Sequence, residues 1–244
     1  MTVFNSPRSK ARKKSDQRKY DIWFNFLITL LATNLLSIYV ASHGTADLNF
    51  IFYEDGVLES LSAIFYFAAA GILALGFKNR PSPLRFWCLF FAVLMFLVGG
   101  EEISWGQRLF GIVTPESLSA VNVQDEFNIH NIDGIHQHVR LAGVAFVSLF
   151  CFLIPISNRL SESLNQFYSR WGIPVFPFNT MWLVLLSLLF MTVPRGMNLP
   201  NTFVLDEIGE FLLSFAWIPF ALYNSLGVTS NAAAEANATT ECDA

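Results

Sequence analysis

Long apolar runs constrain this chain more than any other feature, because a helix of about 20 apolar residues spans the hydrocarbon core of a bilayer. Only 14% of the 244 residues are charged, against ~25% in a typical soluble domain. The sequence therefore predicts an all-α fold, a polytopic membrane helix bundle with about six transmembrane helices, and excludes a soluble Rossmann or TIM-barrel enzyme. The apolar windows lie at roughly 22–41, 57–77, 84–103, 139–156, 174–193 and 208–226.

Two of these windows are less regular than the others. The first has a cleavage-like Val40-Ala41-Ser42 at its end, but its apolar region exceeds the 7–15 residues typical of a signal peptide. We therefore expect an uncleaved first helix, with a signal peptide as the alternative. In the fifth window, Pro174 and Pro177 interrupt the first turns, so a clean apolar helix is expected only from Met181.

The lysines and arginines predict the orientation, since they concentrate in cytoplasmic loops. Twelve of the 15 precede the first window or lie between windows two and three or four and five; Arg108, Arg140 and Arg195 lie on the other side. This split predicts cytoplasmic N- and C-termini in the inner (plasma) membrane. The expected organisation is a basic cytoplasmic segment 1–20, a six-helix membrane domain 21–226 with an extracytoplasmic loop at about 104–138, and a disordered cytoplasmic tail 227–244.

The same topology gathers acids and histidines on the extracytoplasmic side. Thirteen of the 19 acids and all four histidines lie outside or within a turn of the outer boundary. A nucleic-acid partner is not expected, because the net charge is -4. The acids are Asp47, Glu54, Asp55, Glu59, Glu101, Glu102, Glu116, Asp125, Glu126, Asp133, Asp206, Glu207 and Glu210, and the histidines are His43, His130, His136 and His138. We expect the functional site on this face.

Four of these acids are deep enough to be costly. Glu59 and Glu210 fall in the first turns of windows two and six, and Glu101 and Glu102 end window three. A charged group costs about 2.5–3.5 kcal/mol at the membrane centre and less near its surface, so these side chains are expected to face the bundle interior. The helix dipole opposes a negative charge at a C-terminal end. Glu101 and Glu102 therefore predict a nearby cation, either Arg108 or a bound metal ion.

Adjacent helical side chains point about 100° apart, so only one of Glu101 and Glu102 is expected to face the site. If the third helix continues past the membrane, Glu101, Trp105 and Arg108 lie on one stripe.

The loop after window three carries the next candidates. Thr114 before Pro115 predicts an N-cap followed by proline at the N1 position, at the start of a short helix. Period-two spacing then places polar residues on one side of an extended segment, where they would contact a headgroup. The His-x-His pair before window four suits metal binding. These residues are Asn122, Gln124, Glu126, Asn128, His130, His136 and His138.

Three motifs in this chain resemble those of an uncharacterised family of bacterial multi-pass membrane proteins with no assigned activity. They are Glu54-Asp55-Gly56, Gly100 to Phe110 and Asn122 to Asn131. The resemblance implies a polytopic inner-membrane fold and transfers no catalytic residues. The chain has no H-E-x-x-H, G-x-S-x-G or P-loop motif.

Three classes of function remain open from the sequence. The first is a metal-dependent hydrolase or transferase that acts at the outer membrane face on a lipid or lipid-linked substrate, with a divalent metal ion as cofactor. The second is a non-enzymatic assembly or partner-binding protein. The third is a cation-coupled transporter. It is disfavoured because transport sites usually lie mid-membrane, where this sequence places no ionisable residue.

The enzyme hypothesis assigns roles to residues. The catalytic candidates are Glu101, Glu102 and His130. The candidate metal ligands are Glu59, Glu102, His130, His136, His138 and Glu210, and the candidate substrate contacts are Asn122, Gln124, Glu126, Asn128, Arg108 and Arg195. For Arg140 and Arg195, salt bridges to the many acids are the simpler interpretation.

Overall fold

In the computed structural model, the regular secondary structure of the described residues is helical, apart from an isolated antiparallel bridge between Asn122 and Ile132. The chain separates into a unit Met1–Leu48 and a unit Asn49–Ala244, and the account below concerns the second. The described residues are 31, 34, 56–107, 109–122, 125–129, 132–197 and 202–226.

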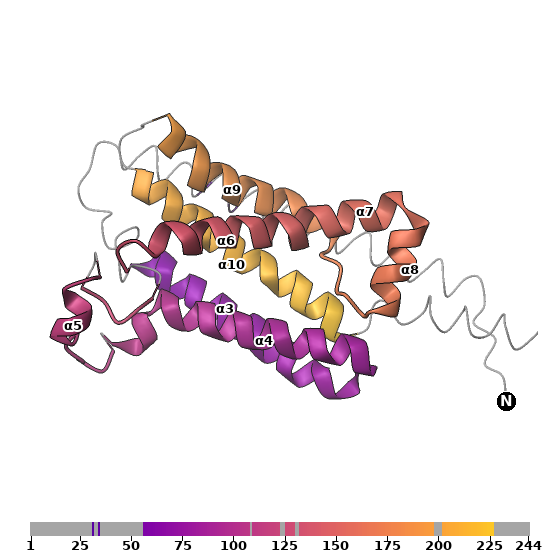
Figure 1. The fold of residues 1–244 in the computed structure, drawn as a ribbon, viewed down its shortest axis with the longest axis horizontal. Coiled ribbons are helices and arrows are strands. Elements are labelled where there is room, and N and C mark those ends of the chain that lie inside the picture. The colour runs from indigo at the N-terminus through magenta and orange to yellow at the C-terminus, as the bar shows by residue number, and fades with distance from the viewer. Residues whose placement is uncertain are drawn as a thin grey trace, which may run out of the picture. The chain divides into compact units, whose positions relative to one another are not determined.

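Long helices alternate with short connecting pieces along this unit (Figure 1). Its helices are α3 (Val57–Gly76), η2 (Phe77–Asn79), α4 (Ser82–Glu102), η3 (Ser104–Gly106), α5 (Glu116–Ser119), α6 (His136–Ser148), the π-helix η4 (Leu149–Leu153), α7 (Ile154–Leu160), α8 (Glu162–Arg170), η5 (Phe178–Thr180), α9 (Met181–Gly196) and α10 (Thr202–Leu226).

Four helical segments among these residues are long and apolar enough to cross a membrane: Val57–Gly76, Ser82–Glu102, Gln137–Leu160 and Phe178–Gly196. They correspond to the second to fifth windows of the sequence, so four of the six predicted spans are supported by helices of spanning length. The first window, 22–41, lies almost wholly outside the described residues. The sixth corresponds to α10, which is not among the four, so six spans stay a prediction.

Helix α10 is nevertheless the core of the bundle. It packs against α3 on one side and α9 on the other, and Ile208, Leu212 and Ala216 have no exposed surface. Two of its polar side chains bond within the helix: Ser214 Oγ donates to the Phe211 carbonyl (2.8 Å) and Asn224 Nδ2 to the Phe220 carbonyl (2.9 Å). A helix enclosed by other helices needs less apolar surface than one that faces lipid.

Small residues set the helix spacing around α10. A Cβ added to Gly209 would lie 2.5 Å from the Cγ of Met191 in α9, and Ser187 Oγ of α9 donates to the Gly209 carbonyl (2.7 Å). At the far end, a Cβ on Gly76 would overlap Ser225 of α10. Close backbone approach through small residues is the usual way in which membrane helices associate.

Three prolines account for local departures from straight α-helix. Pro155 has no N–H to bond four residues back, and the turn before it widens into the π-helix Leu149–Leu153. Pro174 and Pro177 lie in extended backbone, so α9 begins at Met181, as the sequence predicts.

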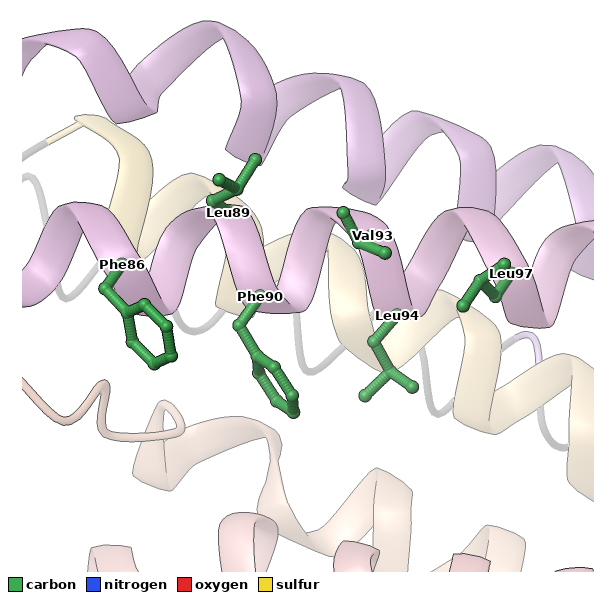
Figure 2. Close-up of a pocket in the computed structure, with 6 residues that line it drawn as sticks. All are labelled: Phe86, Leu89, Phe90, Val93, Leu94 and Leu97. Atoms are coloured by element: carbon green, nitrogen blue, oxygen red, sulfur yellow. The ribbon is translucent and has the colours of Figure 1, made fainter.

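Between α4, η4 and α10 the interior is filled by aromatic rings. Phe91 of α4 has its ring centroid 4.8 Å from that of Phe220 and 5.1 Å from that of Phe150. The opposite face of α4 carries exposed apolar side chains along a groove, and Figure 2 shows Phe86, Phe90 and Leu94 projecting from it one turn apart. In a bilayer such a face contacts lipid.

Candidate functional site

Glu102, the last residue of α4, lies within electrostatic range of three glutamates at the end of the bundle where α3 and α10 begin. Its carboxylate is repelled by Glu59 of α3 and by Glu207 and Glu210 of α10. All four side chains are partly buried. We call these four residues the carboxylate cluster. That the deep acids Glu59, Glu102 and Glu210 face the bundle interior together stays a prediction, and α10 adds Glu207 to the acids within this range.

Two hydroxyl groups of α3 lie next to this cluster. Ser62 and Tyr66 follow Glu59 by three and seven residues, so the three share one stripe of the helix. Tyr66 is 4% exposed, and its phenol is within electrostatic reach of Glu102 and Glu210. Ser62 is 1% exposed, and its Oγ has no hydrogen-bond partner. The hydroxyl group of Ser62, which has no hydrogen-bond partner, is therefore buried in the bundle on the stripe between Glu59 and Tyr66.

Glu101 makes different contacts from those of Glu102. Its carboxylate accepts hydrogen bonds from the Trp105 indole (2.7 Å) and from the Ile129 backbone N–H (2.7 Å), so it ties the end of α4 to the loop. The two adjacent glutamates thus diverge as predicted, with Glu102 facing the cluster and Glu101 facing the loop.

The sequence hypothesis that α4 continues to residue 108 is wrong. The helix ends at Glu102, and Ser104 and Trp105 adopt φ values of 45° and 55°. The left-handed turn folds the Trp105 ring back over Gly100, where a Cβ would lie 2.8 Å from the ring. Trp105 still reaches Glu101, but through this turn and not along a helical stripe.

The alternating polar residues of the loop form a buried network. Ser104 Oγ donates to Glu126 Oε2 (3.0 Å), Asn128 Nδ2 donates to the same oxygen, and Asn122 Nδ2 donates to Asn128 Oδ1 (3.0 Å). Asn122, Glu126 and Asn128 are 7%, 4% and 2% exposed. The period-two pattern places these three side chains together, although Asp125 adopts φ 57° and the segment is not a regular strand. Their predicted contact with a substrate stays a prediction, and their described contacts hold the loop in place.

A second set of hydrogen bonds closes the loop. Gln107 Nε2 donates to Thr114 Oγ1 (2.6 Å), and Thr114 Oγ1 donates to the Asp125 carbonyl (2.6 Å). Gln107 Oε1 accepts from the Phe127 N–H. Thr114 is therefore a loop-closing residue. The predicted short helix is α5, but Pro115 stands at its N-cap position, so the predictions of Thr114 as the N-cap and Pro115 at N1 are each wrong by one residue.

Asp206 bridges two arginines beside the cluster. Arg195 of α9 donates to Asp206 Oδ2 through Nε (2.9 Å) and through a second nitrogen, and Arg140 of α6 lies 3.4 Å from Oδ1. The Asp206 side chain is 8% exposed. The simpler interpretation of Arg140 and Arg195, salt bridges to acids, describes these contacts. The predicted substrate contact of Arg195 stays a prediction.

The structure describes the side chains of only some of the histidines predicted to bind a metal. His138 is exposed on the first turn of α6, with Nδ1 3.0 Å from the Gly134 carbonyl. His136 begins α6, and nothing is described of its side chain. His130, Gln124 and Arg108, and also Glu54 and Asp55, lie outside the described residues. Among the residues that the structure does describe, no group of three or more His, Cys, Asp or Glu side chains can hold a metal ion.

Comparison with known proteins adds no assignment. No family model matches the chain, and no curated protein or solved structure gives a match. The resemblance to uncharacterised bacterial membrane proteins stays a prediction, as does the role of each candidate residue.

Sequence reasoning missed the hydroxyl side of the site. Ser62 and Tyr66 stand in an apolar helix, and Ser104 and Gln107 were assigned no role. A signal was present for the first pair: both lie on the same helical stripe as Glu59. For the second pair, the partners include loop residues 20 or more positions away, which no local pattern indicates.

Proposed function

We propose that this chain is an integral membrane protein that binds a cationic ligand at the carboxylate cluster and acts at the outer membrane face on a lipid or lipid-linked substrate. The observation that carries the proposal is that Glu102 lies within electrostatic range of three glutamates from α3 and α10 at one end of four potential membrane spans. The unpartnered Oγ of Ser62, on the stripe between Glu59 and Tyr66, supports it.

Charge repulsion gives the physical reason. Neighbouring carboxylates disfavour each other's ionised form, and partial burial strengthens the effect because it lowers the local dielectric. A cation relieves this repulsion, so binding and stability are coupled. The donor atoms in the cluster and its neighbours Ser62 and Tyr66 are all oxygens, which suit hard divalent cations such as Mg²⁺, Ca²⁺ and Mn²⁺ or an alkylammonium group.

The finer form of the proposal is a metal-dependent hydrolase or transferase. The described residues alone do not fit a metal site, since none of their His, Cys, Asp and Glu groups can hold an ion. A metal ion at the cluster would need further ligands from the segment that carries His130 and His136. An ammonium headgroup is larger and needs no coordination geometry, so the described carboxylates suffice for it. We therefore derive no catalytic step through a metal.

The first experiment tests the metal. The purified full chain is melted in detergent with a chelator and then with Mg²⁺, Ca²⁺, Mn²⁺ or Zn²⁺ alone, and tryptophan fluorescence follows unfolding. A metal at 100 times its Kd stabilises the folded state by about 2.7 kcal/mol. This shift should vanish in the double variant Glu102→Gln and Glu210→Gln. It should persist in Glu116→Gln, which removes an exposed acid at the same end of the bundle.

The second experiment tests the ammonium headgroup. Native mass spectrometry compares the retention of phosphatidylethanolamine with that of phosphatidylglycerol, which lacks an amine, in the wild-type chain and the same variants. Preferential retention of the amine lipid that the double variant loses supports a lipid ligand. If neither a divalent metal nor the amine lipid depends on Glu102 and Glu210, the cation proposal is refuted, and a non-enzymatic assembly protein becomes the leading alternative.

A further inference from the structure

We infer that α8 is an interfacial helix that lies in the headgroup region of the cytoplasmic leaflet and, together with neighbouring arginines, binds anionic phospholipid. This surface is at the opposite end of the bundle from the carboxylate cluster, and the inference is independent of the proposed function.

The position of α8 follows from its connection to α7. The potential span Gln137–Leu160 ends one residue before α8, and Ser161 between them has extended backbone (φ -131°, ψ 116°). Figure 1 shows α8 turning sharply away from the direction of α7. Ser161 caps the new helix, since its Oγ accepts from the Leu164 N–H (3.4 Å). A helix that turns away within one residue of a membrane-spanning segment lies at the membrane surface.

The sequence of α8 is amphipathic. Leu164, Phe167, Tyr168 and Trp171 follow the spacing i, i+3, i+4, i+7 and make one apolar stripe. The other residues of the helix are polar or charged: Glu162, Ser163, Asn165, Gln166, Ser169 and Arg170. A helix with one apolar and one polar face next to a bilayer lies in the interface plane.

The apolar stripe stays uncovered although the helix itself is firmly attached. Tyr168 OH lies 2.9 Å from Ser157 Oγ of α7, and Trp87 of α4 donates from Nε1 to the Trp171 carbonyl (3.1 Å). Phe167 is 48% and Trp171 59% exposed.

The next residue, Gly172, has φ 59° and lies so close to α4 that a Cβ would sit 2.4 Å from the Leu84 nitrogen. The exposed stripe is therefore a fixed feature of the fold and not a loosely held segment.

The chemistry of this end identifies the occupant as an anionic lipid surface. Exposed aromatic side chains surround α8, including Phe86 of α4 and Phe178 before α9, and aromatic residues concentrate at membrane interfaces. Cations accompany them, and Glu162 is the one acid at this end among the described residues. The cations are Lys78, Arg80, Arg85, Arg159 and Arg170. Each basic side chain near an anionic membrane surface strengthens binding by about fivefold (~1 kcal/mol).

The immersion of α8 is tested with nitroxide labels on the full chain in nanodiscs. Phe167→Cys and Gln166→Cys place labels on the apolar and polar faces, each in a Cys242→Ser background; the buried Cys88 and Cys151 are retained. The Phe167 site should be more accessible to oxygen, which partitions into lipid, and the Gln166 site to a water-soluble nickel chelate. Equal accessibility of both sites to the nickel chelate would overturn the interfacial placement.

The anionic-lipid preference is tested by native mass spectrometry in mixed phosphatidylglycerol and phosphatidylcholine micelles. The double variant Arg159→Gln and Arg170→Gln should retain phosphatidylglycerol about 5–25-fold less well than the wild type. Glu162→Gln is the matched control, because removing the acid of the same helix should leave retention unchanged or raise it. Equal retention by wild type and double variant, or an equal loss in Glu162→Gln, would refute the assignment. A correct melting transition of each variant excludes misfolding as the cause.

Discussion

The two ends of the helical unit differ in the charge of their side chains. One end carries Glu59, Glu102, Glu207 and Glu210, with Asp206 held between Arg140 and Arg195. The other carries arginines, a lysine and exposed aromatic rings around α8. Arginine, lysine and aromatic side chains are common at membrane surfaces, so the basic end costs little free energy. The acidic end places side chains of like charge in the bundle, which is unfavourable. Because this cost arises at the acidic end alone, we infer that the acidic end has the specialised role.

The largest expected effect concerns which end faces the cytoplasm. A reporter that fluoresces only in the cytoplasm should be bright when fused after residue 80 and dark when fused after residue 120, because lysines and arginines stay inside. Whole-cell fluorescence of the two fusions, normalised to protein level, measures this. The reverse pattern would exchange the two ends and place the carboxylate cluster in the cytoplasm.

The next largest effect should come from the loop network at the acidic end. Asn128→Leu removes donors from the buried Glu126 and an acceptor from Asn122. Leaving a buried charged group short of partners should lower stability by about 3 kcal/mol. Melting in detergent measures the change, and Phe127→Leu, at an exposed neighbouring side chain, should change stability by less than about 0.5 kcal/mol. Equal melting temperatures for both variants would contradict a structural role for the network.

A smaller loss is expected for Asp206→Asn. The change removes the charge that Arg140 and Arg195 share, and both arginines are partly exposed, so water compensates part of the loss. Stability should fall by about 1–2 kcal/mol. The thermal midpoint of the variant in metal-free buffer tests this, and an unchanged midpoint would mean that the bridge contributes nothing.

The smallest effect should have the opposite sign. Glu102→Gln removes the carboxylate that Glu59, Glu207 and Glu210 repel, so stability in metal-free buffer should rise by about 0.5–1 kcal/mol. Glu102→Gln and Asp206→Asn remove the same unit of charge at the same end, which makes them controls for each other. If both lower stability alike, the four glutamates are not a repulsive cluster, and the contrast between Asp206 and the cluster disappears.

The helices at both ends were largely predictable, because apolar runs and prolines act locally. Pro174 and Pro177 place the start of α9 at Met181, and the apolar windows two to four coincide with α3, α4 and α6 to α7. The sixth window was harder to judge. Helix α10 is not among the four segments long and apolar enough to cross a membrane, and it packs against α3 and α9.

The candidate site was less predictable, because hydrogen-bond partners come from distant segments. The sequence indicated that Glu101 and Glu102 point different ways, but it did not tell which one faces the loop. It grouped Asn122, Glu126 and Asn128 correctly, yet it assigned them to a substrate. Their mutual bonds with Ser104 depend on the left-handed turn after α4.

The sequence by itself determined which helices are long and apolar enough to cross a membrane and how the two ends differ in charge, because hydrophobicity and loop charge are sums over local residues. Only the tertiary structure decided which groups lie near each acid. Asp206 and Glu207 are chain neighbours, but Asp206 accepts from Arg195, whereas Glu207 lies within electrostatic range of Glu102. Adjacent side chains of a helix point about 100° apart, so one can form a salt bridge while the next lies near like charges. The packing of the helices determines which groups lie in each direction.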